Sequence, residues 1–273
     1  MNTFICPVCH EPLQDNGSSY VCINKHNFDK SKFGYVNLLM SNQSSLKHHG
    51  DDRLMVRARK DFLSKGYYSF LLDEIIKICK KYLPSDACLL DAGCGECYYS
   101  DGVSKAFNDY SIIGVDISKD ALEFAGKRGV KFPLAVASLF ELPVPSSSQD
   151  TVINCFSPKA EDEFKRVLKD NGILIRIVPL EEHLFSLKEA IYKNPYLNDK
   201  PTEDINNLKF VEYREIRKEL YINDNIDISN LFKMTPYYYK TGRDDQEKLL
   251  SLSNFTTQAA FGIFVYRKEK QDA

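Results

Sequence analysis

The chain has 273 residues, of which 43% are hydrophobic and 27% charged, with a formal net charge of −2 at pH 7. The length and composition are typical of a folded protein with one large α/β domain and one small additional domain, and they exclude a disordered chain. The net charge excludes a protein that binds nucleic acid through a generally basic surface. The apolar runs are no longer than a strand, as at 172–178, where Arg176 interrupts the run, so we expect no membrane span. With eight cysteines and no visible export signal, we expect a cytoplasmic protein without disulfides.

The first part of the chain carries two pairs of metal-ligand residues. Cys6 and Cys9 stand in a Cys-x-x-Cys turn, and Cys22 and His26 follow after an interval of twelve residues. Zinc prefers four such ligands in a tetrahedron, and the run Asp15-Asn16-Gly17-Ser18 predicts a hairpin turn between the two pairs. A module of about 35 residues cannot bury enough apolar surface to fold unaided, so structural Zn2+ is physically expected.

Two other interpretations of these residues stay open. The run Cys6-Pro-Val-Cys9-His10 also matches the Cys-x-x-Cys-His of c-type haem attachment. That chemistry would need export and would leave Cys22 and His26 unexplained. The cysteines could also be free and buried.

Charge and composition divide the chain into three parts. We expect a zinc-binding module at 1–37, a linker with the start of a basic helix at 38–60, and the main domain at 61–273, with the polar residues 38–52 typical of a linker or mobile loop. Residues 1–65 hold nine Lys and Arg against six Asp and Glu, and Arg53, Arg57 and Lys60 recur at the spacing of one helix face. This basic stripe predicts contacts with nucleic-acid phosphates, although a plain solvated helix face gives the same pattern.

The rest of the chain is predicted to alternate between helices and strands. A helix is predicted over 53–83, where apolar residues recur with helical spacing until Pro84. Buried strands are expected at 87–90, 111–117, 132–137, 151–156 and 173–178, and helices at 98–107, 120–128 and 160–168. This order predicts an α/β fold, a doubly wound Rossmann-like sheet of parallel strands covered by helices on both faces.

The run Asp91-Ala-Gly-Cys-Gly-Glu96 follows the first of these strands. Gly93 and Gly95 allow a sharp turn and a close approach of the backbone to a ligand at the carboxyl ends of the strands. Asp116 ends the second strand, 21 residues after Gly95, where an acid accepts both hydroxyls of a ribose. A dinucleotide would bind in the same place, but residue 98 is Tyr and the G-x-G-x-x-G spacing is absent, so the loop favours S-adenosylmethionine.

With these residues in view, the chain resembles the bacterial 23S ribosomal RNA (guanine-N1-)-methyltransferases of the RlmA type, which include macrolide-resistance proteins. The likeness runs from Cys6 to the last strand. Beyond the zinc ligands it rests on the runs Lys32-Phe-Gly-Tyr-Val-Asn-Leu-Leu39, Arg59-Lys60-x-Phe62-Leu63-x-x-Gly66-x-Tyr68, Asp91-Ala-Gly-Cys-Gly-Glu96, Phe156-Ser157-Pro158, His183-Leu184 and Met234-Thr235-Pro236. The family pattern implies that Tyr68, Gly95, Glu96 and His183 lie against the cofactor. It also implies a zinc module that helps to grip a 23S ribosomal RNA hairpin and a methyltransferase domain that acts as a homodimer.

The cofactor loop departs from the family pattern at one position, where Cys97 replaces the third glycine. Because cysteine is small, cofactor binding is expected to survive. Cys94 and Cys97 together form a second Cys-x-x-Cys pair. We interpret this pair as a coincidence, because a metal there would occupy the space of the cofactor.

The implied reaction is methyl transfer to N1 of a guanine, in which the protein mainly aligns donor and acceptor. The N1 proton must be removed, but the spacing singles out no catalytic residue for this step. The run Phe156-Ser157-Pro158 follows the fourth strand, where an unstacked base would be held, and Phe156 is a candidate stacking partner. The Asn/Asp-Pro-Pro-aromatic run of exocyclic-amine methylators is absent, which suits a ring nitrogen. Two alternatives are a small-molecule methyltransferase with an accessory zinc module and a non-catalytic ribosomal-RNA-binding protein, the latter kept open by Cys97.

Overall fold

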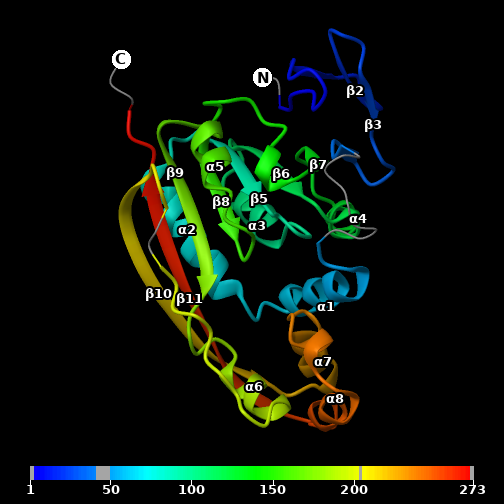
Figure 1. The fold of residues 1–273 in the computed structure, drawn as a ribbon, viewed down its shortest axis with the longest axis vertical. Helices are drawn as coiled ribbons and strands as arrows, with labels where there is room; N and C mark the ends of the chain where they lie inside the picture. Colours follow the sequence, from blue (N-terminus) through cyan, green and yellow to red (C-terminus); the bar gives the residue numbers. More distant parts are fainter. Residues whose placement is uncertain (1–2, 41–49, 203–204, 271–273) are drawn as a thin grey trace.

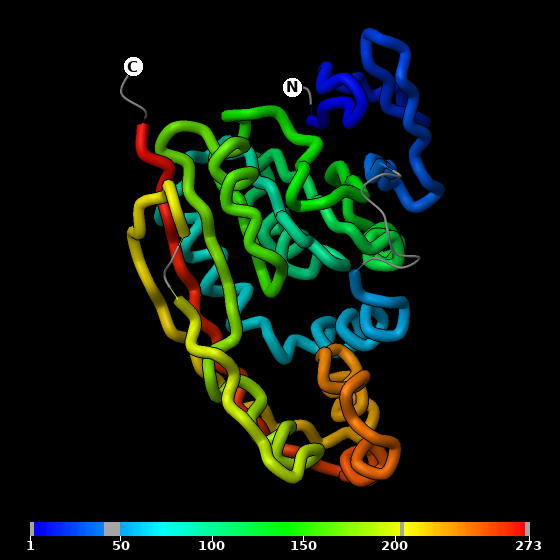
Figure 2. Tube along the Cα trace, viewed as in Figure 1, coloured from blue at the N-terminus to red at the C-terminus, as the bar shows by residue number. Residues whose placement is uncertain are grey.

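The computed structural model describes residues 3–40, 50–202 and 205–270 (Figures 1 and 2). Within them, an eight-stranded sheet has the order β10-β11-β9-β8-β5-β6-β7-β4. Its strands are β4 (Tyr35–Asn37), β5 (Cys88–Ala92), β6 (Ser111–Asp116), β7 (Leu134–Val136), β8 (Gln149–Cys155), β9 (Leu168–Pro179), β10 (Lys209–Ile222) and β11 (Phe255–Arg267). Strands β4 to β9 pair in parallel, whereas β11 lies antiparallel between β9 and β10. The predicted doubly wound sheet is confirmed, with a long antiparallel pair at one edge.

Helices cover both faces of this sheet. They include α2 (Ser69–Tyr82), α3 (Tyr98–Ala106), α4 (Lys119–Arg128) and α5 (Glu161–Val167), while α1 (Arg53–Ser64) packs on α3 and α4. Ile75 of α2 and Val103 of α3 belong to the same buried cluster as Ile175 of β9. Phe164 of α5 packs in a second cluster with Leu174, the neighbour of Ile175 in β9. Because successive side chains of a strand point to opposite faces, the two clusters form the core on the two sides of the sheet.

The helix predicted over 53–83 is in fact two helices, because the chain turns at Gly66 between α1 and α2. Gly66 has a φ of +80°, in the left-handed region that glycine enters at little cost. The amide N–H groups of Lys65 and Gly66 donate to the carbonyls of Phe62 and Leu63 at 3.2 and 2.9 Å and so end α1. The turn sends α1 away from the direction of α2 (Figure 1).

The N-terminal residues form a small sheet of their own. Its antiparallel strands are β1 (Leu13–Asp15), β2 (Ser19–Cys22) and β3 (Asn27–Asp29). The predicted hairpin is confirmed, since the amide of Asn16 donates to the carbonyl of Ser19 at 2.9 Å. The chain then enters the large sheet through β4, which pairs with β7. Residues 41–49 of the predicted linker at 38–52 lie outside the described residues.

After β9 the chain builds a part of the molecule in which we predicted no elements from the sequence. It contains α6 (Phe185–Ile191), α7 (Asn225–Lys233), α8 (Arg243–Leu250) and the short 3-10 helix η3 (Tyr238–Lys240). Another 3-10 helix, η2 (Leu139–Glu141), lies earlier in the chain, after β7. Helix α7 packs on α1, and α8 packs on α6 and α7. Strands β10 and β11 run from the main sheet down to these helices (Figure 2). No helix in the described part of the chain is long and apolar enough to cross a bilayer.

Candidate functional site

The four predicted zinc ligands meet in one cluster of the N-terminal sheet. The ligand atoms of Cys6, Cys9, Cys22 and His26 all lie within 4.8 Å of one another. The sulfurs of Cys9 and Cys22 are 3.7 Å apart, and Nδ1 of His26 lies 3.5 Å from the sulfur of Cys6 and 3.4 Å from that of Cys22. In a zinc tetrahedron, bond lengths of about 2.3 Å to sulfur and about 2.05 Å to nitrogen give edges of about 3.8 and about 3.6 Å. The cluster therefore has the dimensions of a zinc site.

Two tight turns of the backbone present these ligands. The amide of His10 donates to the carbonyl of Cys6 at 2.8 Å, and the amide of Lys25 donates to that of Cys22 at 2.9 Å. His10 and Lys25 have φ values of 60° and 66°, so each turn closes through a left-handed residue. Because all four ligands converge, haem attachment at Cys6 and Cys9 does not account for the geometry. In the described part of the chain, Cys94 and Cys97 belong to no comparable metal cluster.

The predicted cofactor loop turns sharply after β5. Gly93 has a φ of +84°, and a Cβ on it would lie 2.4 Å from Cβ of Ser157, so only glycine fits there. Gly95 has a φ of +55° and faces open space on the side where a Cβ would point. Cys97 adopts a φ of +65° just before α3, a conformation that strains a residue with a Cβ. Cys97 therefore replaces the family's glycine at a position where glycine would have no backbone strain.

Asp116 lies at the end of β6, beside this loop. One of its carboxylate oxygens accepts from the amide of Gly95 and the other from the amide of Ser118, each at 2.8 Å. Burial raises the pKa of Asp116, while these two amides oppose the rise. The acid predicted for the ribose is thus held at the carboxyl end of the sheet, in contact with the glycine loop.

The two other acids of the loop region are buried. Asp91 is 3% exposed, and burial raises its pKa to about 7. Glu96 is 2% exposed and forms an ion pair with Arg128 of α4, whose Nε donates to its Oε2 at 2.7 Å. The second carboxylate oxygen of Glu96 has no hydrogen-bond partner among the described residues. The structure therefore anchors Glu96 to α4, and its contact with the cofactor stays a prediction.

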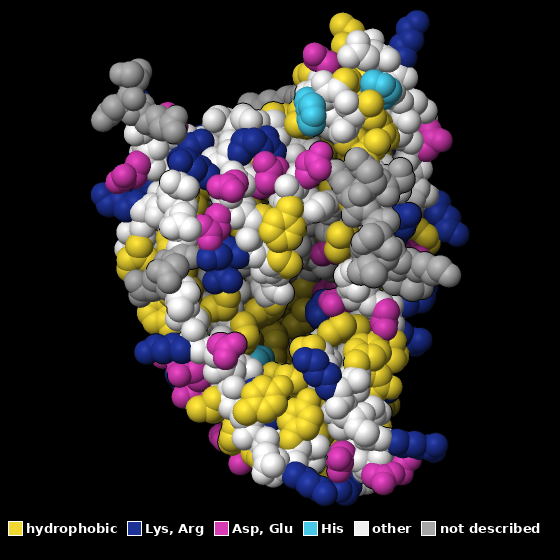
Figure 3. All heavy atoms as spheres, viewed as in Figure 1, with side chains coloured by type: hydrophobic (Ala, Val, Ile, Leu, Met, Phe, Trp, Pro, Cys, Tyr) yellow, Lys and Arg dark blue, Asp and Glu magenta, His cyan; other side chains and the backbone are white. Residues whose placement is uncertain are grey.

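Aromatic side chains gather where β8 and β9 end. The ring of Phe261 lies 5.0 Å from that of Tyr68, 4.7 Å from that of His183 and 5.2 Å from that of Phe156. Tyr99 of α3 adds a ring 6.5 Å from Phe156. The face shown in Figure 3 is hollowed in this region, with hydrophobic side chains on the floor of the hollow and a histidine at its edge. The sequence-predicted Tyr68, Phe156 and His183 are thus brought together in one aromatic cleft.

His183 is held as a neutral ring. Its Nδ1 accepts a hydrogen bond from the amide of Ala260 at 3.1 Å. Burial, reinforced by the charge of Lys188, lowers the pKa of His183 to about 3. A neutral imidazole that accepts at Nδ1 carries its proton on Nε2. His183 can therefore donate a hydrogen bond from Nε2, but it is not available as a base at Nδ1.

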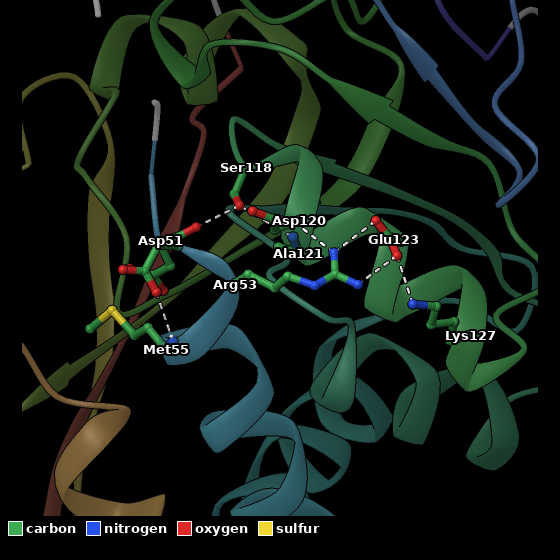
Figure 4. Close-up of polar contacts among 9 residues, drawn as sticks. Asp51, Arg53, Met55, Ser118, Asp120, Ala121, Glu123 and Lys127 are labelled. Carbon is green, nitrogen blue, oxygen red and sulfur yellow. Dashed lines mark hydrogen bonds and ion pairs between the residues drawn. The ribbon is translucent and has the colours of Figure 1, made fainter. Parts of the chain in front are cut away.

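The basic stripe is already engaged by acidic side chains of the protein. Arg53 lies between Asp120 and Glu123 of α4, with nitrogen–oxygen distances of 3.0 Å to both (Figure 4). Arg57 and Lys60 share Asp61, at 3.8 and 3.0 Å. Arg53 thus joins α1 to α4, whereas the side chain of Arg57 remains 73% exposed. The RNA contacts predicted for these residues stay a prediction.

Arg59 of α1 was missed by sequence reasoning as a site residue, although it falls within a run that carries the family resemblance. It pairs with Asp51, and its Nη2 donates to the carbonyl of Met234 at 3.3 Å. The carbonyl of Asp51 in turn accepts from the hydroxyl of Ser118, at the end of β6 (Figure 4). Burial raises the pKa values of Glu96, Asp116 and Tyr99, and the charge of Arg59 opposes the rise at each of them. The positive charge of Arg59 therefore acts on acids of the cofactor loop and on a tyrosine of the cleft.

Comparison with known proteins yields relatives that match between 68% and 88% of this chain. The 23S rRNA (guanine(748)-N(1))-methyltransferase of Streptomyces fradiae is 30% identical over 189 residues, which span 68% of this chain and 66% of that protein. YxjB of Bacillus subtilis, assigned by name to the 23S rRNA (guanine-N(1)-)-methyltransferases, is 30% identical over 259 residues, or 88% of both chains. The crystal structure of the YcgJ protein from Bacillus subtilis superposes with a TM-score of 0.52 at 18% identity, over 74% of this chain and 100% of that one, which shows a shared fold.

Two family models match separate parts of the sequence. Residues 89–172 match the model described as a methyltransferase domain, and residues 4–45 match the one described as the N-terminal part of RlmA, a zinc ribbon. With the glycine loop after β5 and the acid that ends β6, the fold defines an S-adenosylmethionine-dependent methyltransferase. Within this class, the zinc ribbon model and the match along 88% of YxjB both indicate the methyltransferases that act on 23S rRNA. The chain belongs to the RlmA-type family of 23S rRNA (guanine-N1-)-methyltransferases.

Proposed function

We propose that this protein transfers the methyl group of S-adenosylmethionine to N1 of a guanine in a hairpin of 23S ribosomal RNA. The observation that carries the proposal is the joint presence of a four-residue Cys/His cluster and a methyltransferase cleft, with the chain passing from the cluster into the large sheet through β4. Relatives that are 30% identical carry names that state this reaction. In this proposal the zinc module at 1–37 contacts the RNA, and the protein acts as a homodimer.

The residues of the cleft fit the cofactor. Gly95 leaves the loop surface bare where the adenosine and methionine parts would lie. Each carboxylate oxygen of Asp116 accepts one hydrogen bond from a backbone amide and has a further lone pair for a hydrogen bond from a ribose hydroxyl. The guanidinium of Arg59 is suited to the amino-acid carboxylate, which it would bind as a two-pronged ion pair. The hydroxyl of Tyr68 is buried and without a hydrogen-bond partner among the described residues, so it can bond the same part of the cofactor.

When bound, the sulfonium supplies an activated methyl group, and the protein has to present the guanine to it. Phe156 adopts a φ of +54° directly after β8 and is 46% exposed. Such a strained backbone persists where its surroundings hold it, and it keeps the ring at the cleft beside Phe261. A guanine that has left its stack could lie against this ring.

The cofactor contact that the family pattern implies for His183 stays a prediction, and we propose a further role for this residue toward the guanine. N1 of guanine attacks once its proton has gone, and the resulting negative charge is shared with O6. A neutral His183 that donates from Nε2 would stabilise charge on O6 and would distinguish guanine from adenine, which carries an amino group there.

The test is a transfer assay with zinc-loaded protein, a 23S ribosomal RNA transcript and radiolabelled S-adenosylmethionine. We expect label in the RNA and, after digestion to nucleosides, in 1-methylguanosine. The variant Phe156→Ala should bind S-adenosylhomocysteine normally but transfer much more slowly. Calorimetric binding of S-adenosylhomocysteine without any label in RNA would support a small-molecule methyltransferase instead. No binding of S-adenosylhomocysteine would support a non-catalytic RNA-binding protein.

A further inference from the structure

A cavity of about 520 Å³ lies between the carboxyl half of β9 and the segment at 196–202. These two stretches run side by side in Figure 2. The lining residues are Lys159, Arg176, Val178, Pro179, Tyr196, Leu197, Asn198, Asp199, Lys200, Pro201 and Thr202. They include three cationic side chains and one carboxylate, and Glu161 pairs with Lys159, so one positive charge is left in excess.

Arg176 is an unusual member of this lining. It interrupts the apolar run at 172–178 of β9 and lies on the sheet face shared by Leu174 and Val178. Its Nε is buried and has no hydrogen-bond partner among the described residues. Burial lowers its pKa, while the charges of Tyr266 and Glu161 oppose this shift. A bound anion would give this partly buried guanidinium the hydrogen-bond acceptor that its Nε lacks.

The cavity adjoins the segment proposed to hold the guanine. Asn154 of β8 is the in-register neighbour of Arg176, and its side chain donates to the hydroxyl of Ser157 at 2.5 Å and to the carbonyl of Pro158 at 3.1 Å. Lys159 comes next in the chain and lines the cavity while pairing with Glu161. The same few residues therefore connect the base-holding segment to the cationic cavity.

The outer wall of the cavity is firmly held and partly apolar. Lys188 donates to the carbonyl of Tyr196 at 2.9 Å and to the side chain of Asn198 at 2.6 Å, which fixes this wall to α6. Tyr196 and Leu197 nevertheless remain 52% and 51% exposed. An aromatic side chain beside a cationic cavity is a common arrangement for holding a nucleotide by its base and its phosphate.

We propose that this cavity binds a backbone phosphate of the RNA next to the target guanine, with Arg176 as the central ligand. The inference rests on the proposed function, since it concerns the same RNA. The guanidinium presents paired N–H donors in the geometry that a phosphate accepts. A phosphate held here would keep the strand in place while the neighbouring base enters the aromatic cleft.

The experiment compares Arg176→Gln with Arg267→Gln in the full-length, zinc-loaded protein. Arg267 is a matched control because its Nε also lacks a partner among the described residues, but its guanidinium lies 5.9 Å from the ring of Tyr82, on the other face of the sheet. Binding of a 23S ribosomal RNA fragment is measured over a range of salt concentrations. Binding of S-adenosylhomocysteine, thermal unfolding and 31P detection of inorganic phosphate binding are measured in parallel.

We expect Arg176→Gln to weaken RNA binding roughly tenfold at low salt, because one charged ligand of the phosphate is removed. The slope of log affinity against log salt should fall by about 0.7–0.9, the value for one neutralised phosphate. Arg267→Gln should change neither quantity. Cofactor affinity and thermal stability of Arg176→Gln should stay at the wild-type level, because no internal ion pair is broken.

Three results would overturn the inference. An unchanged RNA affinity and salt slope in Arg176→Gln would show that the cavity does not hold the backbone. Phosphate binding that depends on Arg176 while RNA binding does not would assign the cavity to a free anion. A fall in thermal stability together with RNA affinity would make Arg176 a structural residue. If the wild-type protein itself neither binds nor methylates the RNA, the proposed function is refuted, and the inference about the cavity is refuted with it.

Discussion

The role of Arg59 can be isolated with two cofactor analogues. S-adenosylhomocysteine carries the amino-acid carboxylate, whereas 5′-methylthioadenosine keeps the nucleoside and lacks the amino-acid part. If the Arg59 guanidinium binds the carboxylate, as we propose, Arg59→Gln should weaken binding of the first ligand and leave binding of the second within a factor of two. A residue that merely shapes the cleft would affect both ligands alike.

The size of the effect follows from what Arg59 bonds in the structure. A hydrogen bond to a charged group contributes about 1.5–3 kcal/mol. Arg59 already pairs with Asp51, so the carboxylate would replace an existing partner rather than bind an unpaired guanidinium. We therefore expect a net loss of about 1–2 kcal/mol, which is roughly 5- to 30-fold in affinity.

Isothermal titration calorimetry of both ligands is the assay. Arg57→Gln is the matched control, because Arg57 lies two residues earlier on α1 with a side chain that is 73% exposed and pairs with Asp61. It should bind both analogues like the wild type. Equal weakening of both ligands by Arg59→Gln, or wild-type affinity for S-adenosylhomocysteine, would refute the assignment.

Further predictions concern the metal, the ribose acid, the α1–α4 contact and the strained loop residue. Cys22→Ser should lower bound zinc from about one per chain to near zero and unfold the N-terminal sheet, with S-adenosylhomocysteine binding preserved; wild-type zinc content in the variant by metal analysis would contradict this. Asp116→Ala should weaken cofactor binding by about 2–4 kcal/mol, because a charged acceptor is removed; a change below twofold in calorimetry would place the ribose elsewhere. Arg53→Gln should lower the thermal midpoint more than Arg57→Gln does, by a margin that shrinks in high salt, since Arg53 pairs with acids of α4 whereas Arg57 pairs with Asp61 of its own helix; equal midpoints would mean that the ion pairs of Arg53 do not stabilise the fold. Cys97→Gly should be more stable to urea than Cys97→Ala by about 1 kcal/mol, because both remove the sulfur and only glycine relaxes at a φ of +65°; the opposite order would show that the position is unstrained.

The sequence predicted the parts of the structure that depend on neighbours in the chain. The zinc ligands come in two local turns, and the parallel strands alternate with helices at short intervals, so periodicity and spacing were enough to find them. Gly66 shows the limit of periodicity, because α1 and α2 share one apolar pattern and only the conformation of a single glycine separates them.

The features of the site that we did not predict from the sequence depend on contacts between residues far apart in the chain. Arg53 looked like a free cation because its partners, Asp120 and Glu123, lie on another helix of the folded protein. Phe261 is the centre of the aromatic cleft, yet it lies in β11, far along the chain from Tyr68 and Phe156. Residues 35–37 were assigned to the zinc module with no strand predicted there. They form β4, and its pairing with β7 is a long-range contact that no local signal reveals.

The most direct test of the central claim is made in cells that carry or lack the gene for this protein. N1-methylguanine blocks base pairing, so reverse transcription of 23S ribosomal RNA stops at the modified position. We predict one guanine stop in a hairpin that is present in the parent strain, absent from the deletion strain and restored by the wild-type gene but not by a gene encoding Asp116→Ala. Identical stop patterns in parent and deletion strains would contradict methylation of 23S ribosomal RNA by this protein.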